Sequence, residues 1–197
     1  MLTNRRHHVA RIAVAAILVT TSLRADGPVS ANESHIRATS PALQSLVDES
    51  IERSPAFRAL VEQINASNVV VYLRHHLLGS AGPDGRLMFV GAAGGRRYVL
   101  IQIGCLHTRI DEFAILAHEL QHAAEVGAAP SIVDAASLAR HYTAIGFVAR
   151  QWQHGIAFET SAAKDAASLV QQEVIESIRT EEAAARASHA SAASTRN

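Results

Sequence analysis

Two amphipathic helices are predicted near the start of the patterned part of the chain. Serine precedes proline at Ser40-Pro41 and again at Ser54-Pro55. Serine is a good helix N-cap and proline suits the first helical position, so each pair predicts a helix start. Apolar residues recur at helical spacing after each start: Leu43, Leu46, Val47 and Ile51, then Phe57, Leu60, Val61 and Ile64. We expect both helices to pack on a sheet.

The pattern changes between residues 68 and 103, where β-branched and aromatic residues predict three strands. These runs span 68–74, 86–90 and 97–103. Glycine-rich stretches at 79–85 and 91–95 separate them and predict turns. We therefore expect a three-stranded antiparallel meander.

Helical patterning returns in the second half of the chain. Three further helices are predicted, at residues 110–126, 131–145 and from about Phe158 to Ile178. The residues between the last two, 146–157, are predicted to form a loop. From Ala183 to Asn197 the chain is rich in alanine and serine, which predicts a disordered tail.

The N-terminus has the three parts of a secretory signal. Arg5, Arg6 and Arg11 make a basic region, and the apolar stretch 12–23 follows it. Small residues at Val29-Ser30-Ala31 fit a cleavage site, so residues 1–31 are predicted as a signal peptide. A run this short spans a bilayer poorly, although an uncleaved N-terminal anchor is the alternative. We expect an exported protein, periplasmic or secreted, with no stable membrane association after cleavage.

Composition narrows the class of protein further. The formal net charge is zero and 48% of the residues are hydrophobic, which indicates a globular chain and no nucleic-acid partner. Cys105 is the only cysteine, so no intramolecular disulfide forms and the core must stabilise the fold alone. A polar leader at 32–40 and one domain over residues 32–182 are expected after the signal.

The most informative motif lies in the helix predicted at 110–126. It carries the pattern His-Glu-x-x-His, as His118, Glu119 and His122. Residues four apart share one helix face, so the two imidazoles are placed to bind one metal ion. Zinc suits such a pair, and Glu119 beside them is placed to take a proton from a metal-activated water.

A third zinc ligand is needed, because a catalytic zinc usually has three protein ligands and one open position. Glu125 lies on the same helix face but a turn beyond His122, where its carboxylate reaches back poorly. Glu159 is better placed at the predicted start of the last helix, where the small side chains of residues 160–163 permit close packing. We therefore favour Glu159 and keep Glu125 as the alternative.

This combination of residues resembles the gluzincin zinc metallopeptidases. In that family two histidines of the motif and a distant glutamate bind zinc, and the glutamate after the first histidine is the general base. The resemblance implies His118, His122 and Glu159 as Zn²⁺ ligands and Glu119 as the base. It also implies an α+β fold, a small zincin-like domain with a short antiparallel sheet packed on the metal-binding helix and two C-terminal helices. The 37-residue spacing from His122 to Glu159 is longer than in the thermolysin branch.

The predicted activity is hydrolysis of peptide bonds in a peptide or protein substrate. A donor for the developing oxyanion is expected among Tyr142, His141 and His154. Two alternatives stay open: a catalytically inactive zincin-like binding module, and a small exported helical interaction protein without metal. Metal content separates the helical interaction protein from the other two hypotheses. The activity of a Glu119→Gln variant separates the enzyme from the binding module.

Overall fold

The computed structural model describes residues 34–76, 84–104, 107–152 and 155–194. The chain separates into residues 1–33 and a compact unit from Ser34 to Asn197, and the description below concerns the second unit. The predicted signal peptide, residues 79–83 of the predicted turn, Cys105 and His154 lie outside the described residues.

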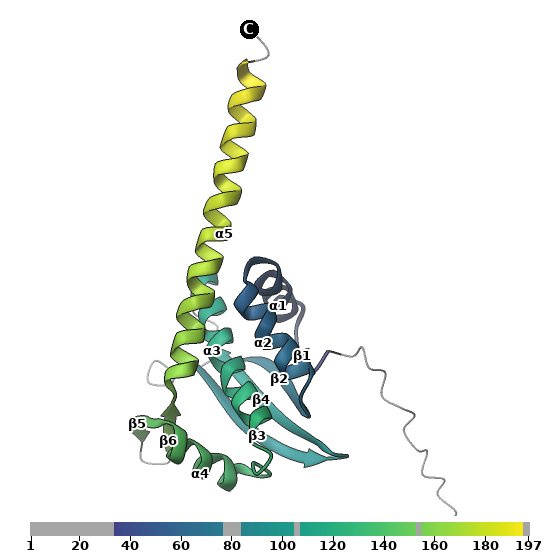
Figure 1. The fold of residues 1–197 in the computed structure, drawn as a ribbon, viewed down its shortest axis with the longest axis vertical. Coiled ribbons are helices and arrows are strands. Elements are labelled where there is room, and N and C mark those ends of the chain that lie inside the picture. Colours follow the sequence, from purple (N-terminus) through teal and green to yellow (C-terminus); the bar gives the residue numbers. More distant parts are fainter. Residues whose placement is uncertain (1–33, 77–83, 105–106, 153–154, 195–197) are drawn as a thin grey trace, which may run out of the picture. The chain divides into compact units, whose positions relative to one another are not determined.

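Helices and strands are interspersed along the described chain, which confirms the α+β class. In order they are β1 (Ile36–Ala38), α1 (Pro41–Arg53), α2 (Pro55–Asn65), β2 (Val69–His76), β3 (Gly85–Ala93), β4 (Arg96–Gly104), α3 (Arg109–Ala128), α4 (Ala135–Ile145), β5 (Phe147–Trp152), β6 (Gly155–Glu159) and α5 (Ser161–Ser194) (Figure 1).

The main sheet is mixed, so the predicted antiparallel meander is wrong. Its strand order is β1-β2-β4-β3; β2 runs parallel to both β1 and β4, and β3 runs antiparallel to β4. Val69, Val70 and Val71 of β2 are all fully buried. A strand buried on both faces suits an interior position with parallel neighbours. Because β2 takes the place between β1 and β4, the glycine- and alanine-containing β3 lies at the edge of the sheet.

The turn between β3 and β4 is shorter than the glycine-rich stretch suggested. Ala93 pairs with Arg96, so only Gly94 and Gly95 form the turn. Both have positive φ, 57° and 76°, as a tight hairpin turn with the twist of its strands requires.

β1 replaces part of the predicted polar leader. Residues 36–38 pair in parallel with Val71, Tyr72 and Leu73, and Ile36 is buried against the core. A strand of three residues is too short to show the alternation that predicts longer strands.

Both serine caps behave as predicted. The Ser40 hydroxyl accepts from the Leu43 N–H at 3.3 Å, and the Ser54 hydroxyl accepts from the Phe57 N–H at 3.0 Å. The buried faces of α1, α2, α3 and α5 then form one core with alternate residues of the sheet. Large members of this core with no solvent exposure include Phe57, Phe113, Leu43, Leu46, Leu73 and Ile101.

The segment predicted as a loop, 146–157, forms most of a hairpin instead. β5 and β6 pair antiparallel, and a register shift between Val148 and Arg150 interrupts their alternation. That irregularity removes the regular period by which strands are predicted. α5 consequently begins at Ser161, and the Thr160 hydroxyl accepts from the Ala163 N–H at 3.1 Å as its cap.

The predicted tail is also wrong as far as Ser194, because α5 continues through it. All its side chains from Arg179 to His189 are exposed. Their composition correctly indicates that this segment adds nothing to the core. Alanine has the highest helix propensity, however, so an alanine-rich segment can form a helix without packing against a core.

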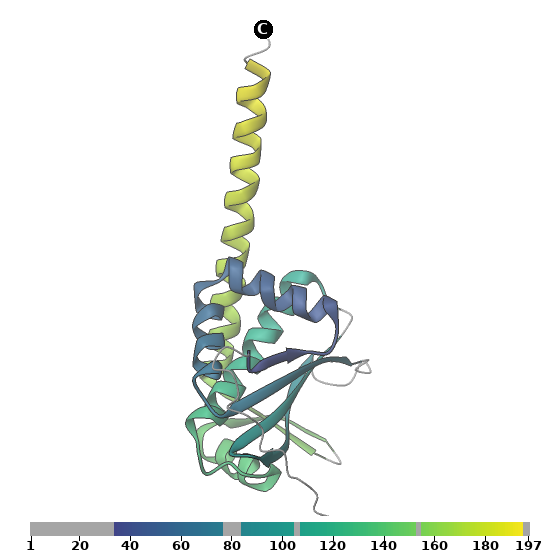
Figure 2. The same cartoon turned by 90° about the vertical axis from the view of Figure 1, so that its right-hand side faces the viewer.

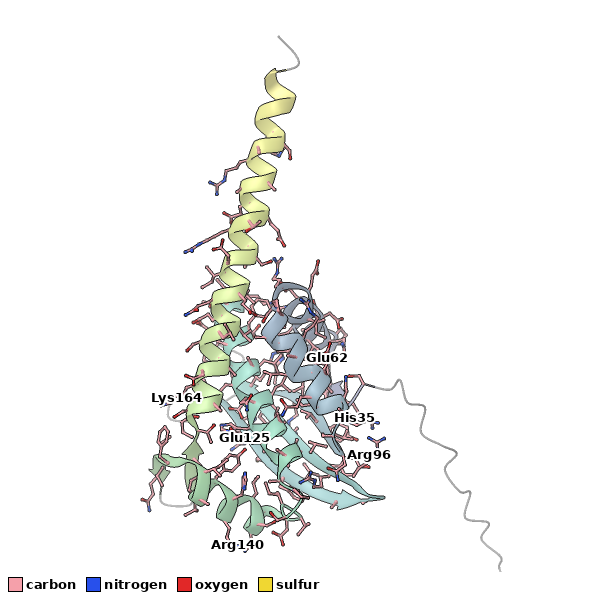
Figure 3. The ribbon with its side chains drawn as sticks, viewed as in Figure 1. His35, Glu62, Arg96, Glu125, Arg140 and Lys164 are labelled. Carbon is pink, nitrogen blue, oxygen red and sulfur yellow. The ribbon has the colours of Figure 1, made fainter. Side chains whose placement is uncertain are left out.

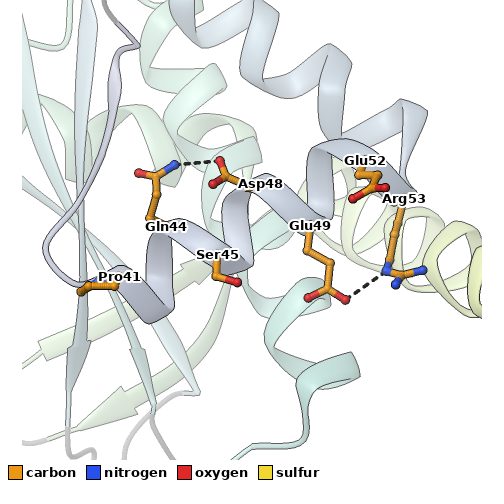
Figure 4. A pocket seen from close by; sticks show the side chains of 7 residues that line it. All are labelled: Pro41, Gln44, Ser45, Asp48, Glu49, Glu52 and Arg53. Carbon is orange, nitrogen blue, oxygen red and sulfur yellow. Dashed lines mark hydrogen bonds and ion pairs between the residues drawn. The ribbon is translucent and has the colours of Figure 1, made fainter.

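Two surface observations complete the description. None of the helices within the described ranges is both long and apolar enough to cross a membrane. A shallow depression of about 550 Å³ lies along α1 (Figure 4), and none of its lining residues belongs to the motif on α3; they are Pro41, Gln44, Ser45, Asp48, Glu49, Glu52 and Arg53.

Candidate metal centre

α3 carries the His-Glu-x-x-His motif and is fixed at both ends. The Thr108 hydroxyl accepts from the Asp111 N–H at 3.3 Å and caps the N-terminus. At the other end the buried Arg97 guanidinium donates to the Ala129 and Gly127 carbonyls at 2.6 Å and 3.1 Å. A cation here satisfies carbonyls that the helix leaves unpaired and complements its dipole. The motif is therefore held on a rigid element.

His118 and His122 lie one turn apart with their ring centroids separated by 4.9 Å. Glu159 faces both rings: its Oε1 lies 3.2 Å from His118 Nε2 and 3.7 Å from His122 Nε2. The donor atoms of these three residues all lie within 4.8 Å of one another. The structure thus brings together the three residues that the sequence suggested as ligands.

The donor set suits zinc in number, chemistry and spacing. Two ligand atoms, each about 2 Å from a tetrahedral ion, lie roughly 3.3 Å apart. The two separations from Glu159 Oε1, 3.2 Å and 3.7 Å, lie near this value, and all three donor atoms lie within 4.8 Å of one another. Two imidazoles and one carboxylate would leave one tetrahedral position open.

Glu159 reaches the site from a different element than predicted. It is the last residue of β6 rather than the start of the final helix, and it pairs with Phe147 across the hairpin. The Thr160 N–H donates to Glu159 Oε1 at 2.9 Å and orients the carboxylate. The residue is the expected one, but a strand end and a helix cap position it.

Glu125, the alternative ligand, contacts the other side of His122. The His122 Nδ1–H donates to Glu125 Oε2 at 2.8 Å, because a carboxylate can only accept. The Thr160 hydroxyl donates to Glu125 Oε1 at 2.7 Å (Glu125 is labelled in Figure 3). This pairing fixes the imidazole with Nε2 toward Glu159, which is how a carboxylate typically orients a metal-binding histidine.

The pKa values of the two histidines shift in opposite directions. Burial lowers the pKa of His118, with the charge of Glu159 opposing the shift. Burial also acts to lower the pKa of His122, but the hydrogen bond to Glu125 and three nearby carboxylates raise it overall. Burial alone would raise the pKa of Glu125, yet its bonds to His122 and Thr160 lower it. The contact between His122 and Glu125 therefore raises the pKa of the imidazole and lowers that of the carboxyl.

Glu119 lies on the sheet side of α3. Its side chain is buried, and burial raises its pKa to about 7, with the charge of His122 opposing this shift and that of Glu159 adding to it. A Cβ at residue 85 would lie 2.7 Å from Glu119 Oε1 and 2.8 Å from Ile115 Cγ2. The absence of a side chain at Gly85 therefore allows the carboxyl to fit against the start of β3.

Tyr142 was one of three expected oxyanion donors, but its hydroxyl is engaged within the protein. It donates to the His122 carbonyl at 3.1 Å, and its ring packs between His122 and Phe158 at 5.2 Å and 6.4 Å. Burial raises the pKa of this phenol. His141, on the same helix, contacts the Tyr142 ring edge-on at 5.7 Å. Tyr142 thus supports α3 from α4, and His141 packs against Tyr142.

Sequence reasoning missed the positions that support the ligands. Glu125 was considered only as a ligand, although its position three residues after His122 also predicts a side-chain pair on one helix face. Thr160 has three contacts here: it orients Glu159 and Glu125 and caps α5. Threonine before a helix predicts a cap, but nothing in the sequence links it to Glu125.

Comparisons of the chain with protein-family models, with curated proteins and with solved structures each returned no match.

Proposed function

We propose that this protein is an exported zinc-dependent metallopeptidase. The observation that carries the proposal is the convergence of His118, His122 and Glu159, whose donor atoms lie within 4.8 Å of one another. Glu119, a buried carboxyl on the same helix, supports it as the proton acceptor. The resemblance of these four residues to the gluzincin set points to the same chemistry.

The residues of the chain have separate roles in this proposal. When bound, zinc would supply Lewis-acid polarisation of the scissile carbonyl and a lowered pKa for water. His118, His122 and Glu159 would hold the ion, and Glu125 would keep His122 in the correct tautomer. Glu119 would accept a proton from the attacking water and pass it to the leaving amine.

β3 supports a peptide as the substrate. It is an edge strand of the main sheet, and Gly85 at its start contacts Glu119. An edge strand presents unpaired N–H and C=O groups, to which an extended peptide can add as a further strand. A peptide bound in this way would pass close to the proposed base.

A metal-free binding module is the second candidate, because the histidines and glutamates of the cluster also pair with one another. Glu159 lies within ion-pair distance of both histidines, and Glu125 pairs with His122. Such pairs stabilise the imidazoles without an ion when these are protonated.

One variant pair tests the proposal. Wild type, purified without chelators, is expected to hold about one zinc per chain, and Glu119→Gln should retain it because Glu119 is not a ligand. Loss of a general base typically lowers a rate about 10²–10⁴-fold, so Glu119→Gln should lose cleavage of an unbiased peptide library. Equal cleavage by both proteins, or zinc without cleavage in wild type, would contradict the peptidase, and absence of zinc from wild type would leave the metal-free binding module.

The proposed export has its own readout. The mature protein should begin near Asn32, which N-terminal sequencing of the extracytoplasmic fraction measures. An intact Met1 in the membrane fraction would indicate an anchor instead.

A further inference from the structure

The main sheet has a face that the described helices do not cover, and its side chains are exposed or half-buried except Val70 and Gln102, which are buried. Odd-numbered residues of its two central strands, such as Val71 and Ile101, belong to the core beneath α1, α2 and α3. Even-numbered residues point the opposite way, because neighbours on a strand alternate between faces. Figure 2 shows the sheet in front, with α3 and α5 behind it. We call the residues on its front the open sheet face: Arg74, Arg86, Arg96, Tyr72, Tyr98, Gln102, Leu100 and Met88.

The open sheet face is basic. None of the residues in β1, β2, β3 and β4 is acidic, whereas arginine occurs on every one of these strands. Among the described residues, no carboxylate forms an ion pair with Arg74, Arg86 or Arg96. Arg96 donates to His35 Nε2 at 2.6 Å, because a guanidinium cannot accept, and this contact supplies no negative charge (both are labelled in Figure 3). A chain with no net charge thus concentrates uncompensated positive charge on one face.

Three donor groups form a single row across this face. Gln102 of β4 is the direct partner of Arg74 on β2 and of Arg86 on β3. Arg86 Nε donates to Gln102 Oε1 at 2.6 Å, which fixes the amide and leaves Nε2 as a donor. Gln102 is fully buried, and its Nε2 has no hydrogen-bond partner. A buried donor without an acceptor is destabilising, so an anionic group that enters when the flanking arginine side chains move would satisfy it.

Two aromatic rings lie beside the donor row. Tyr72 and Tyr98 stack with their centroids 6.4 Å apart and their planes 25° from parallel. Both side chains are half-buried. Stacked rings turn their faces toward each other, so they offer a ligand their edges and their hydroxyl groups, and the Tyr72 hydroxyl already accepts from Arg37 at 3.4 Å. The face therefore places two hydroxyl-bearing rings beside the donor row.

We propose that the open sheet face binds an acidic polysaccharide, a chain of sugar rings that carry carboxylates. Arg74, Arg86 and Gln102 would bind a carboxylate, for which the planar guanidinium is well matched. Tyr72 and Tyr98 would contact the sugar ring next to it. Nucleic acid fits less well, because the protein as a whole has no excess positive charge and its N-terminus predicts export. This inference is independent of the metal centre, which lies on the helical side of the sheet.

Binding of polygalacturonate, a linear uronic-acid polymer, to the full chain tests the proposal by calorimetry. Neutral dextran is the polymer control, and binding should weaken with added salt. Replacing both Arg74 and Arg86 with alanine is expected to weaken binding roughly tenfold or more, because two charge-assisted contacts are lost. Arg140→Ala is the matched control, since this exposed arginine lies on α4, away from the face (Figure 3).

Gln102→Leu separates a ligand-binding role from a structural one. It removes the unpartnered donor, so the thermal midpoint should stay the same or rise while polymer binding weakens. The proposal is overturned if polygalacturonate does not bind, or if Arg140→Ala weakens binding as much as the double variant. It is also overturned if a single-stranded oligonucleotide of equal charge binds more tightly, because the face would then be a nucleic-acid site.

Discussion

α3 and the junction between β6 and α5 contribute to the same cluster in different ways. α3 supplies His118, Glu119 and His122 within five positions, and the helical period alone places the two imidazoles on one face. The junction supplies Glu159, which depends on the β5–β6 hairpin and on the packing of α5 for its position. The first half of the site is therefore a local property of the sequence, and the second half is a property of the fold.

Removing an imidazole on α3 should have the largest effect. His122→Ala deletes one of the three proposed ligands and leaves the half-buried Glu125 with only its hydrogen bond from Thr160. We expect zinc content measured by elemental analysis to fall close to zero. His141→Ala is the control, because His141 lies near Tyr142 but outside the cluster. Full zinc content in His122→Ala would exclude this cluster as the metal site.

The two carboxylates can be ranked against each other. Glu159→Gln replaces a proposed ligand and should weaken zinc binding more than about 100-fold. Glu125→Gln replaces an orienting partner, and such changes typically cost about 10–100-fold. Competition with a chromophoric chelator measures both affinities. The opposite order would mean that Glu125 is the ligand and that the hairpin does not position the site.

A smaller effect is expected where β3 contacts α3. Gly85→Ala would place a methyl group 2.7 Å from Glu119 Oε1, and overpacking of this kind typically costs about 1–3 kcal/mol. Zinc content should not change, because no ligand moves. Gly91→Ala on the same strand is the matched control, since a Cβ there meets nothing within 4 Å. Equal denaturation midpoints for the two variants would contradict the close contact at Glu119.

The smallest effect is expected at the α1 side of α3. Glu49 accepts from Arg109 at 2.9 Å and Arg53 at 3.0 Å. Burial acts to raise the pKa of Glu49, but these two arginines lower it overall. A lowered pKa stabilises the fold at pH values above the ordinary 4.5, and this contribution is lost as the pH falls through the lowered value.

Glu49→Gln should therefore reduce the free energy of unfolding by less than about 1 kcal/mol at neutral pH, since the pair is partly exposed. The difference from wild type should vanish in acid, well below pH 4.5. Glu52→Gln is the control in the same denaturant titration, because Glu52 is exposed and lies three residues after Glu49 on α1. A difference that grows in acid would contradict the sign of the shift.

Local signals predicted the helices well and the sheet less well. The Ser-Pro pairs located α1 and α2 because a cap and its first turn are neighbours in sequence. β2 pairs directly with β4, although β3 separates them in sequence, and no local pattern records such a long-range pairing. The hairpin at 147–159 was missed because its irregular register hides the alternation of its strands.

The candidate site divides in the same way. The motif on α3 could be predicted because two histidines four residues apart lie on the same face of a helix. Glu159 could be suggested from its small neighbours, but its place at a strand end could not. Thr160 illustrates the limit: its bond to Glu125 joins residues 35 apart, and only the folded chain brings them together.

α5 contacts the rest of the domain along only part of its 34 residues. Val170 and Val174 are fully buried in the core, and the ion pair of Glu181 with Arg53 at 2.7 Å is the last described contact with another element. Opening of a helix end that lacks tertiary contacts requires little free energy, whereas opening of the packed turns requires unfolding of the core. Amide hydrogen exchange along α5 should therefore be fast in the C-terminal turns and slow in the packed turns around Val170 and Val174. The proposed ligand Glu159, at the end of β6, would then lie on the packed side of a helix whose other end opens freely.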